Sequence, residues 1–262
     1  MLNFYKPLAI GLFVATLSGG LALRADTTEI FTGSCGPSCG DSTAGMTLSA
    51  TAAFDLSTDG HTLTITLANT ASTPVRVPAD ILTGVFFNVN PGVLSSGTAS
   101  LGSGSEILNG DGTVNNSAIV GNYWGYASGV SAQGKSFAIS ASGAVNDLGH
   151  ANFGDGSALQ GVGGGTVTGI ANNANGGVTG KGPYFDNSIV FTFHTSNFTL
   201  ADLGNSVVFQ YGTDLSETHY SGTVTAMPET STLATLLAYL VLSSVAGVLY
   251  RRYRRGHQTP SA

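Results

Sequence analysis

Two cysteines near the beginning of the chain are the residues whose spacing most directly indicates a covalent bond. Cys35 and Cys39 are the only cysteines, and they enclose Gly36, Pro37 and Ser38. In an oxidising compartment two cysteines this close tend to pair, and two ligands alone are too few for a structural zinc site. We therefore expect a Cys35–Cys39 disulfide that pins a turn, with two free thiols as the alternative.

The same stretch matches a hydrolase pattern but lacks the setting that the pattern requires. Residues 36–40 read Gly-Pro-Ser-Cys-Gly, which fits Gly-x-Ser-x-Gly. That pattern exposes a nucleophilic serine only where a strand turns sharply into a helix of an α/β sheet. No helical periodicity follows, and no base accompanies the serine. We expect no enzymatic activity, no catalytic residue and no cofactor, and a secreted hydrolase is the least favoured class.

Histidines and carboxylates are too scattered to predict a metal centre. None of the five histidines forms a His-x-His or His-x3-His pair; they are His61, His150, His194, His219 and His257. Asp111, Asp155 and Asp186 lie in glycine-rich stretches and could offer oxygens to calcium, but none has the spacing of a calcium-binding loop. Aspartate as a turn-forming residue is the favoured interpretation, and we expect no metal.

One small aromatic group could contact sugar rings. Tyr123, Trp124 and Tyr126 stand together between glycines, and Trp124 is the only tryptophan. Aromatic faces in a loop can stack on the apolar faces of sugars, so a glycan contact is one hypothesis. The alternative, which is favoured, is that the single tryptophan fills the core.

The elements that position these residues have the period of strands. Residues 62–67 and 188–193 alternate polar and apolar side chains, and further candidates are 47–54, 81–89, 135–140, 205–211 and 220–225. Strict alternation gives one buried and one wet face, as in antiparallel sheets. We expect an all-β domain over 26–226, an antiparallel, jelly-roll-like β-sandwich whose glycine-rich middle, 92–182, forms long loops.

The charge distribution excludes a nucleic-acid partner. Charged residues make up only 9% of the chain, and Arg76, Lys135 and Lys181 are the only basic residues in 26–229, a range that holds all fifteen acidic residues. Binding to phosphates needs a basic patch, which this region lacks.

The first 25 residues have the layout of a secretory signal peptide. Lys6 precedes a short apolar run that ends in small residues, and we expect cleavage after Ala25. The alternative is a retained membrane helix, for which the apolar run is short. The Sec translocon and signal peptidase are therefore expected partners.

The C-terminal residues predict a membrane span. Residues 233–250 carry no charge, and Arg251, Arg252, Arg254 and Arg255 follow at once. Eighteen helical residues extend about 27 Å, close to the thickness of a bilayer core. Clustered arginines stop transfer and stay cytoplasmic, so we expect a single-pass inner-membrane precursor with its domain on the periplasmic side and residues 256–262 inside.

This three-part tail resembles a PEP-CTERM sorting signal. Residues 227–232 read Met-Pro-Glu-Thr-Ser-Thr, and the apolar span and the basic end (251–255) follow. Thr230 stands where that family usually has a second proline after Pro228 and Glu229. The stretch 208–217, Val-Phe-Gln-Tyr-Gly-Thr-Asp-Leu-Ser-Glu, also resembles a subgroup of these surface proteins. The resemblance implies an exosortase-type membrane protease as partner and a host that makes an exopolysaccharide.

Together these features predict a structural component of the cell surface or extracellular matrix, associated with exopolysaccharide or biofilm. The alternative is a carbohydrate-binding module for the exopolysaccharide. The two differ in whether a defined saccharide site exists.

Overall fold

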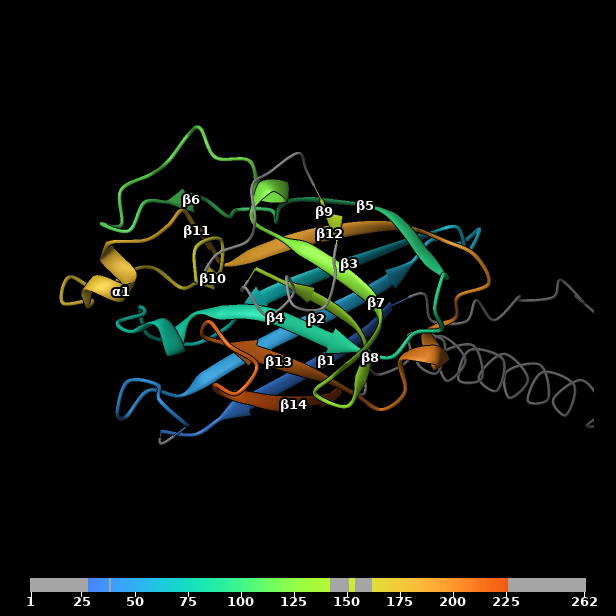
Figure 1. Ribbon diagram of the computed structural model, residues 1–262, viewed down its shortest axis with the longest axis horizontal. Coiled ribbons are helices and arrows are strands. Elements are labelled where there is room, and N and C mark those ends of the chain that lie inside the picture. The colour runs from blue at the N-terminus through green and yellow to red at the C-terminus, as the bar shows by residue number, and fades with distance from the viewer. Residues whose placement is uncertain (1–27, 38, 142–150, 154–161, 226–262) are drawn as a thin grey trace, which may run out of the picture.

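A computed structural model describes residues 28–37, 39–141, 151–153 and 162–225 of the protein (Figure 1). The expected signal peptide lies outside the described residues. So does the expected sorting tail, including Pro228, Glu229, Thr230 and the arginine cluster. In the part of the chain that is described, no helix has the length and apolar character needed to cross a membrane.

The described residues form an all-β fold with very little helix. Short 3-10 turns occur at Pro78–Asp80, Val120–Asn122 and Leu200–Leu203, and one α-helical turn, α1, at Gly176–Thr179. The strands are β1 (Thr28–Cys35), β2 (Leu48–Leu56), β3 (Thr62–Asn69), β4 (Leu82–Phe87), β5 (Leu94–Leu101), β6 (Ile107–Leu108), β7 (Gly125–Ala132), β8 (Lys135–Ser140), β9 (Ala151–Asn152), β10 (Thr166–Val167), β11 (Tyr184–Asp186), β12 (Ser188–Thr195), β13 (Ser206–Tyr211) and β14 (His219–Val224).

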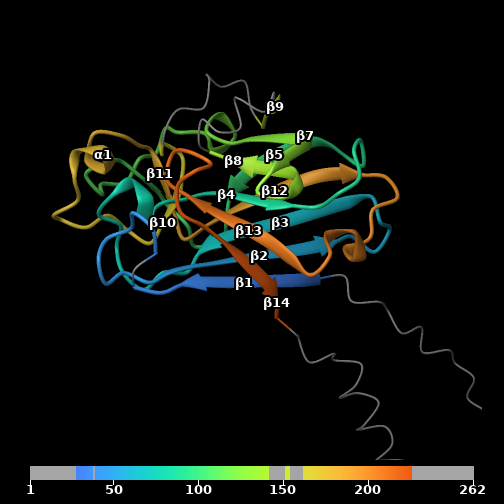
Figure 2. The same ribbon diagram turned by 60° about the horizontal axis from the view of Figure 1, so that its bottom comes forward.

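Hydrogen bonds connect these strands into one sheet that curls and forks. The main path runs β5-β12-β3-β2-β1-β14-β13-β4. From β4 one branch continues through β8, β7 and β9, and the other through β10, β11 and β6. The pairs are antiparallel except β10 with β11, so the expectation of a purely antiparallel sheet was wrong at this point. Figure 2 shows the β7–β8 side of the sheet lying above the long strands β1–β3.

Alternation explains why the long strands pack as they do. In β3 every second residue is buried, which sends Leu63, Ile65 and Leu67 into the core and leaves threonines on the other face. The neighbouring β12 repeats the pattern and buries Ile189 and Phe191. A period of two is the geometry of a strand with one covered face.

Aromatic side chains join the two halves of the curled sheet. Phe54 of β2 meets Phe87 of β4 with ring centroids 5.0 Å apart, and Phe137 of β8 meets Phe193 of β12 at 5.7 Å. Both contacts are edge-on, the arrangement that the ring quadrupole favours, at about 0.5–1.5 kcal/mol per pair beyond burial. The core therefore lies inside the curl.

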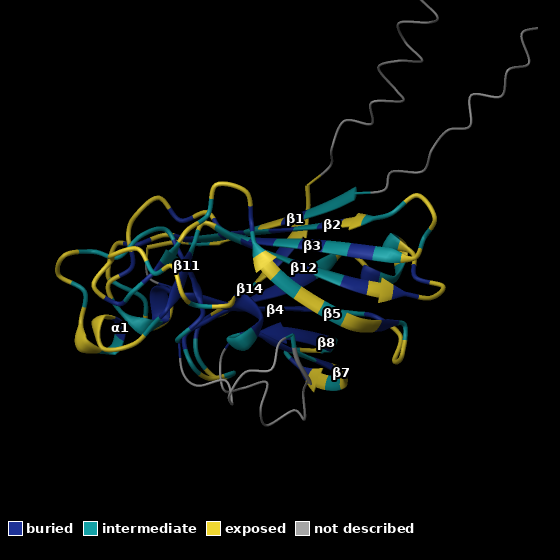
Figure 3. Cartoon of the chain, turned by 90° about the horizontal axis from the view of Figure 1, so that it is seen from above, coloured by how far each residue is buried: buried dark blue, intermediate teal, exposed yellow. Residues whose placement is uncertain are grey.

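Strand β4 departs from the expected alternation because it is covered on both faces. All six of its residues are buried, whereas β5 at the sheet edge shows exposed positions (Figure 3). A second apolar cluster covers the outer face of this region; it contains Phe86, Ala132, Ala138 and Val208, with Val130 and Leu215 packed against it.

The glycine-rich middle of the chain contains more strands than the sequence analysis predicts, together with loops such as 109–119 and 168–175. Within 92–182 lie the eight-residue strands β5 and β7, the strand β8, and three two-residue strands. β7 and β8 form a hairpin that supplies one wall of the core. The sequence analysis did not predict β5 and β7, because small residues pair through their backbones without large apolar side chains to indicate a strand.

The first and last described strands are neighbours. Thr225 N donates to Ile30 O at 2.8 Å, and Phe31 pairs with Val224. Residues 28 and 225 therefore lie close together, towards the end of the curled sheet that is remote from α1 and β6 (Figures 1 and 2).

Candidate functional site

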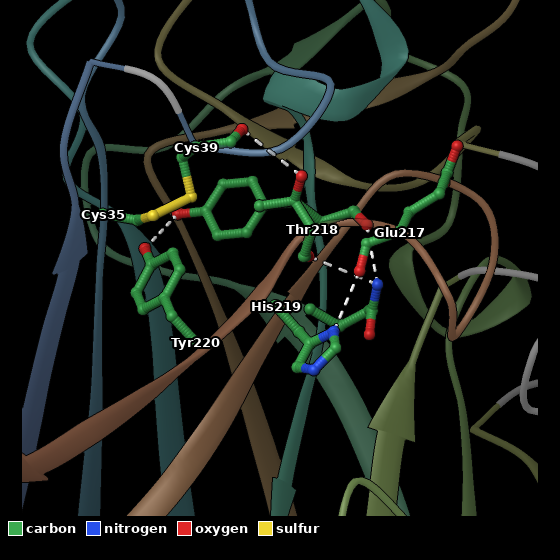
Figure 4. The surroundings of a disulfide bond; sticks show 8 residues. Cys35, Cys39, Glu217, Thr218, His219 and Tyr220 are labelled. Atoms are coloured by element: carbon green, nitrogen blue, oxygen red, sulfur yellow. Dashed lines mark hydrogen bonds between the residues drawn. A yellow bond between two sulfur atoms is a disulfide. The ribbon is translucent and has the colours of Figure 1, made fainter.

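Cys35 and Cys39 form a disulfide at the end of β1 (Figure 4). Their sulfur atoms are 2.00 Å apart and their Cα atoms 5.6 Å apart. The turn is held further by Gly45 N, which donates to Pro37 O at 3.0 Å, and by Thr218 Oγ1, which donates to Cys39 O at 3.4 Å. These contacts tie the N-terminal turn to the start of β14.

Two tyrosines fill the space next to this corner. The Tyr211 and Tyr220 hydroxyls are 2.8 Å apart, and the rings stack with centroids 5.5 Å apart. Burial raises the pKa of both phenols, so both stay neutral at physiological pH. Gly33 of β1 is required here because a Cβ would come within 2.9 Å of the Tyr220 ring. We call this corner, formed by Cys35, Cys39, Tyr211 and Tyr220, the clamp, because its contacts hold the end of β1 in place.

Trp124 is buried, which contradicts the hypothesis that it contacts a glycan. The side chain is 0% exposed, and its indole Nε1 donates to Gly164 O at 2.7 Å. Its ring lies 5.1 Å from that of Phe191. A tryptophan with its face packed and its N–H satisfied is a core residue, as in the alternative interpretation of the sequence.

The rings of Tyr123 and Tyr126 also pack against other aromatic rings of the domain. The Tyr126 ring lies 4.9 Å from that of Phe153 and 5.1 Å from that of Phe193. The Tyr123 ring lies 6.1 Å from that of Phe185. Both tyrosines are half-buried. The three residues therefore do not form an exposed aromatic platform.

No metal centre is found among the described residues. They contain no group of three or more His, Cys, Asp or Glu side chains that could hold an ion. The carboxylate of Asp186 has one buried oxygen without a hydrogen bond, and burial raises its pKa. His150, Asp155 and His257 lie outside the described residues, as does Ser38 of the Gly-x-Ser-x-Gly match.

A polar cleft of about 410 Å³ lies between two loops at the α1 end of the molecule. One wall comes from the loop after β6 and the other from the segment between α1 and β11. The lining residues are Asn109, Gly110, Asp111, Asn115, Thr179, Gly180, Lys181, Gly182 and Pro183. The cleft is largely open to solvent, and its lining is mostly polar. We define these nine residues as the 109–183 cleft.

A chain of hydrogen bonds fixes the first wall of the 109–183 cleft. Asn115 Nδ2 donates to Asn109 Oδ1 at 2.9 Å, and Asn109 Nδ2 donates to Thr113 Oγ1 at 3.0 Å. Thr113 in turn donates to Asp111 Oδ1 from its hydroxyl at 2.6 Å and from its amide at 2.9 Å. These two bonds lower the pKa of Asp111, the side-chain bond most, so the carboxylate is ionised at neutral pH.

A hydrogen bond from Tyr184 holds the second wall in place. This buried side chain donates its hydroxyl to Val178 O at 2.9 Å, under the segment that carries Thr179 and Lys181. The walls come close together at Gly110, where a Cβ would overlap the carbonyl groups of Thr179 and Lys181. Glycine at this position therefore lets the two loops meet.

Two charged groups in the cleft remain available to a ligand. In the described part of the chain, no hydrogen bond or ion pair engages the Lys181 ammonium or the second carboxylate oxygen, Oδ2, of Asp111. Both residues are exposed. Sequence reasoning missed this site because its walls are joined by the short β6–β11 pairing, and two-residue strands leave no periodic signal.

Comparison of the chain with protein-family models, with curated proteins and with solved structures found no match.

Proposed function

We propose that the protein is an exported structural component of the cell surface or extracellular matrix, sorted by an exosortase-type system. The observation that carries the proposal is the tail: an uncharged stretch at 233–250 directly followed by Arg251, Arg252, Arg254 and Arg255. Such a segment is stable across a bilayer with the arginines on the cytoplasmic side, which directs the preceding domain outward.

Three features of the described domain support an extracellular setting. The Cys35–Cys39 disulfide suits an oxidising compartment. The low content of charge, with an excess of acidic residues, suits a secreted surface that does not bind nucleic acid. The adjacency of residues 30 and 225 lets one tether at the C-terminus hold the whole domain without unfolding either end of the sheet.

We further propose that the curled sheet serves as a jelly-roll-like sandwich. In a sandwich, two layers of strands pack face to face around one core. Here aromatic contacts of β2 with β4 and of β8 with β12 join the two halves of the curled sheet. A module whose strands share one core is suited to a structural role in a matrix.

Mass spectrometry of the mature C-terminus tests the sorting proposal. We expect wild-type cells to yield a chain that ends near Pro228 and Glu229, and cells without the sorting protease to yield the tail intact. Replacing both residues by alanine should also leave the tail intact. The matched variant Thr230→Pro, which restores the usual second proline, should still be cut. An uncut tail in wild-type cells would replace sorting by a plain single-pass anchor.

A carbohydrate-binding module is the second candidate. The Trp124 loop no longer supports it, but the polar 109–183 cleft does.

A further inference from the structure

We propose that the 109–183 cleft is a binding site for a neutral saccharide with neighbouring hydroxyl groups. A saccharide hydroxyl both donates and accepts hydrogen bonds, so a site for two adjacent hydroxyls needs an acceptor beside donors. Asp111 Oδ2 is a charged acceptor and the Lys181 ammonium a charged donor, and within the described residues neither is engaged by a hydrogen bond. Hydrogen bonds to charged groups are about twice as strong as neutral ones.

The remaining lining residues are mostly polar, and their side chains already make hydrogen bonds within the loops: Asn115 to Asn109, Asn109 to Thr113, and Thr179 Oγ1 to Asn175 O. The side chains of Asn109, Asn115 and Thr179 are polar and uncharged, and three glycines expose backbone. The hydrogen bonds that run from Asn115 through Asn109 and Thr113 to Asp111 hold the first wall in place before a ligand arrives. A site that is already ordered costs less entropy to fill.

Other ligand classes fit the cleft less well. Divalent cations need several carboxylate or carbonyl oxygens, and Asp111 is the only acidic residue in the lining. A phosphate or a polyanion would gain a single cation, Lys181, and would face the Asp111 carboxylate. An apolar ligand would leave the polar walls without partners, which is costly.

The cleft lies where a ligand outside the cell would be met. It is next to α1 and β6, at the opposite end of the curled sheet from residues 28 and 225 (Figure 1). If the chain is tethered by its C-terminus, the cleft points away from the membrane. This orientation depends on the proposed function, whereas the binding chemistry of the cleft does not.

A saccharide-binding assay on the full chain tests the inference. The chain is purified in an amine-oxide detergent, because glycosidic detergents would compete, and is probed on an array of neutral and acidic oligosaccharides. Titration calorimetry then measures the affinity of the strongest neutral binder. We expect Asp111→Asn to weaken binding at least about tenfold, because it removes a charged acceptor and keeps the side-chain shape. Lys181→Met should weaken binding to a similar degree.

Asp59→Asn is the matched control. Asp59 accepts from Ser57 and from the amide two residues ahead, as Asp111 does, but it lies in the β2–β3 turn. This variant should bind within about twofold of the wild type, a difference smaller than one hydrogen bond accounts for. Should Asp111→Asn fail to fold, Lys181→Met carries the test, because Lys181 is exposed and its ammonium makes no hydrogen bond or ion pair to the residues that the structure describes.

Three results would overturn the inference: no neutral saccharide bound at millimolar concentration, equal losses in both aspartate variants, or binding restricted to acidic saccharides. The test is independent of sorting. A chain found in the cytoplasm that still binds through Asp111 would refute the proposed function alone.

Discussion

Truncating Trp124 should remove a large part of the stability of the domain. The side chain is 0% exposed and packs against Phe191, so Trp124→Ala would leave a cavity in the core. Large-to-small changes of this kind cost about 3–5 kcal/mol. The same change strips the Gly164 carbonyl of its indole donor at 2.7 Å, which adds a penalty for a buried unpaired acceptor.

A second variant separates these two contributions. Trp124→Phe keeps an aromatic ring in the core but cannot donate to Gly164 O, so it should cost less than Trp124→Ala. We expect a loss of about 1–3 kcal/mol for the hydrogen bond, with an added cost for the smaller ring. Ile119→Ala is the control, because Ile119 is 63% exposed and its truncation should change stability by no more than about 0.5 kcal/mol.

Urea unfolding followed by circular dichroism measures all three variants. Circular dichroism is needed because Trp124 is the only tryptophan, so its variants lose that fluorescence signal. In the wild type the same fluorescence should be blue-shifted and should move to the red on unfolding. If Trp124→Ala left the free energy of unfolding within about 0.5 kcal/mol of the wild type, Trp124 would not be a core residue, and its role as a glycan contact would have to be reconsidered.

Three further predictions concern the clamp, a loop glycine and a buried carboxyl. Cys35→Ser removes the disulfide and should lower the free energy of unfolding by about 2 kcal/mol under non-reducing conditions, with no difference from the wild type once both are reduced. In thermal melts, Gly164→Ala should cost more than Gly104→Ala. Both glycines have positive φ, so alanine at either position should cost about 1–2 kcal/mol of backbone strain. A Cβ added at position 164 would also overlap Tyr123, whereas one at position 104 would face open space. Burial raises the pKa of Asp186 above 3.8, so the stability that its neutral form contributes is present below 3.8 and is lost as pH rises through the folded pKa. Urea unfolding should therefore show Asp186→Asn gaining stability relative to the wild type at neutral pH but not below pH 3.8, and equal gains at these two pH values would refute the assignment.

Strands with alternating or continuous apolar residues were predictable, and β1, β5 and β7, which are rich in small or polar residues, were missed. The expected strand at 135–140 coincides with β8, and those at 62–67 and 188–193 fall within β3 and β12. In these strands a one-sided core imposes a period of two. β5, with the sequence LSSGTASL, alternates only weakly, because the inward positions of this edge strand include the small residues Gly97 and Ala99.

The candidate site depended on information that the sequence does not display locally. Asn109, Gly110, Asp111 and Gly112 indicate a turn, and the structure has one there. That this turn meets Lys181 follows from the pairing of β6 with β11 over 70 residues away in sequence, and this pairing is fixed by the whole sheet. The aromatic group failed as a site predictor because residue type alone does not tell a core ring from a surface ring.

Membrane topology distinguishes an exported β domain from a cytoplasmic one. In cells without the sorting protease, cysteines introduced at exposed Ser103 and at Ser261 are treated with a membrane-impermeant maleimide, first in spheroplasts and then after lysis. Cys35 and Cys39 are paired and should not react. We expect position 103 to react in intact spheroplasts and position 261 only after lysis. Labelling of position 261 but not of position 103 before lysis would place the β domain in the cytoplasm and contradict the account.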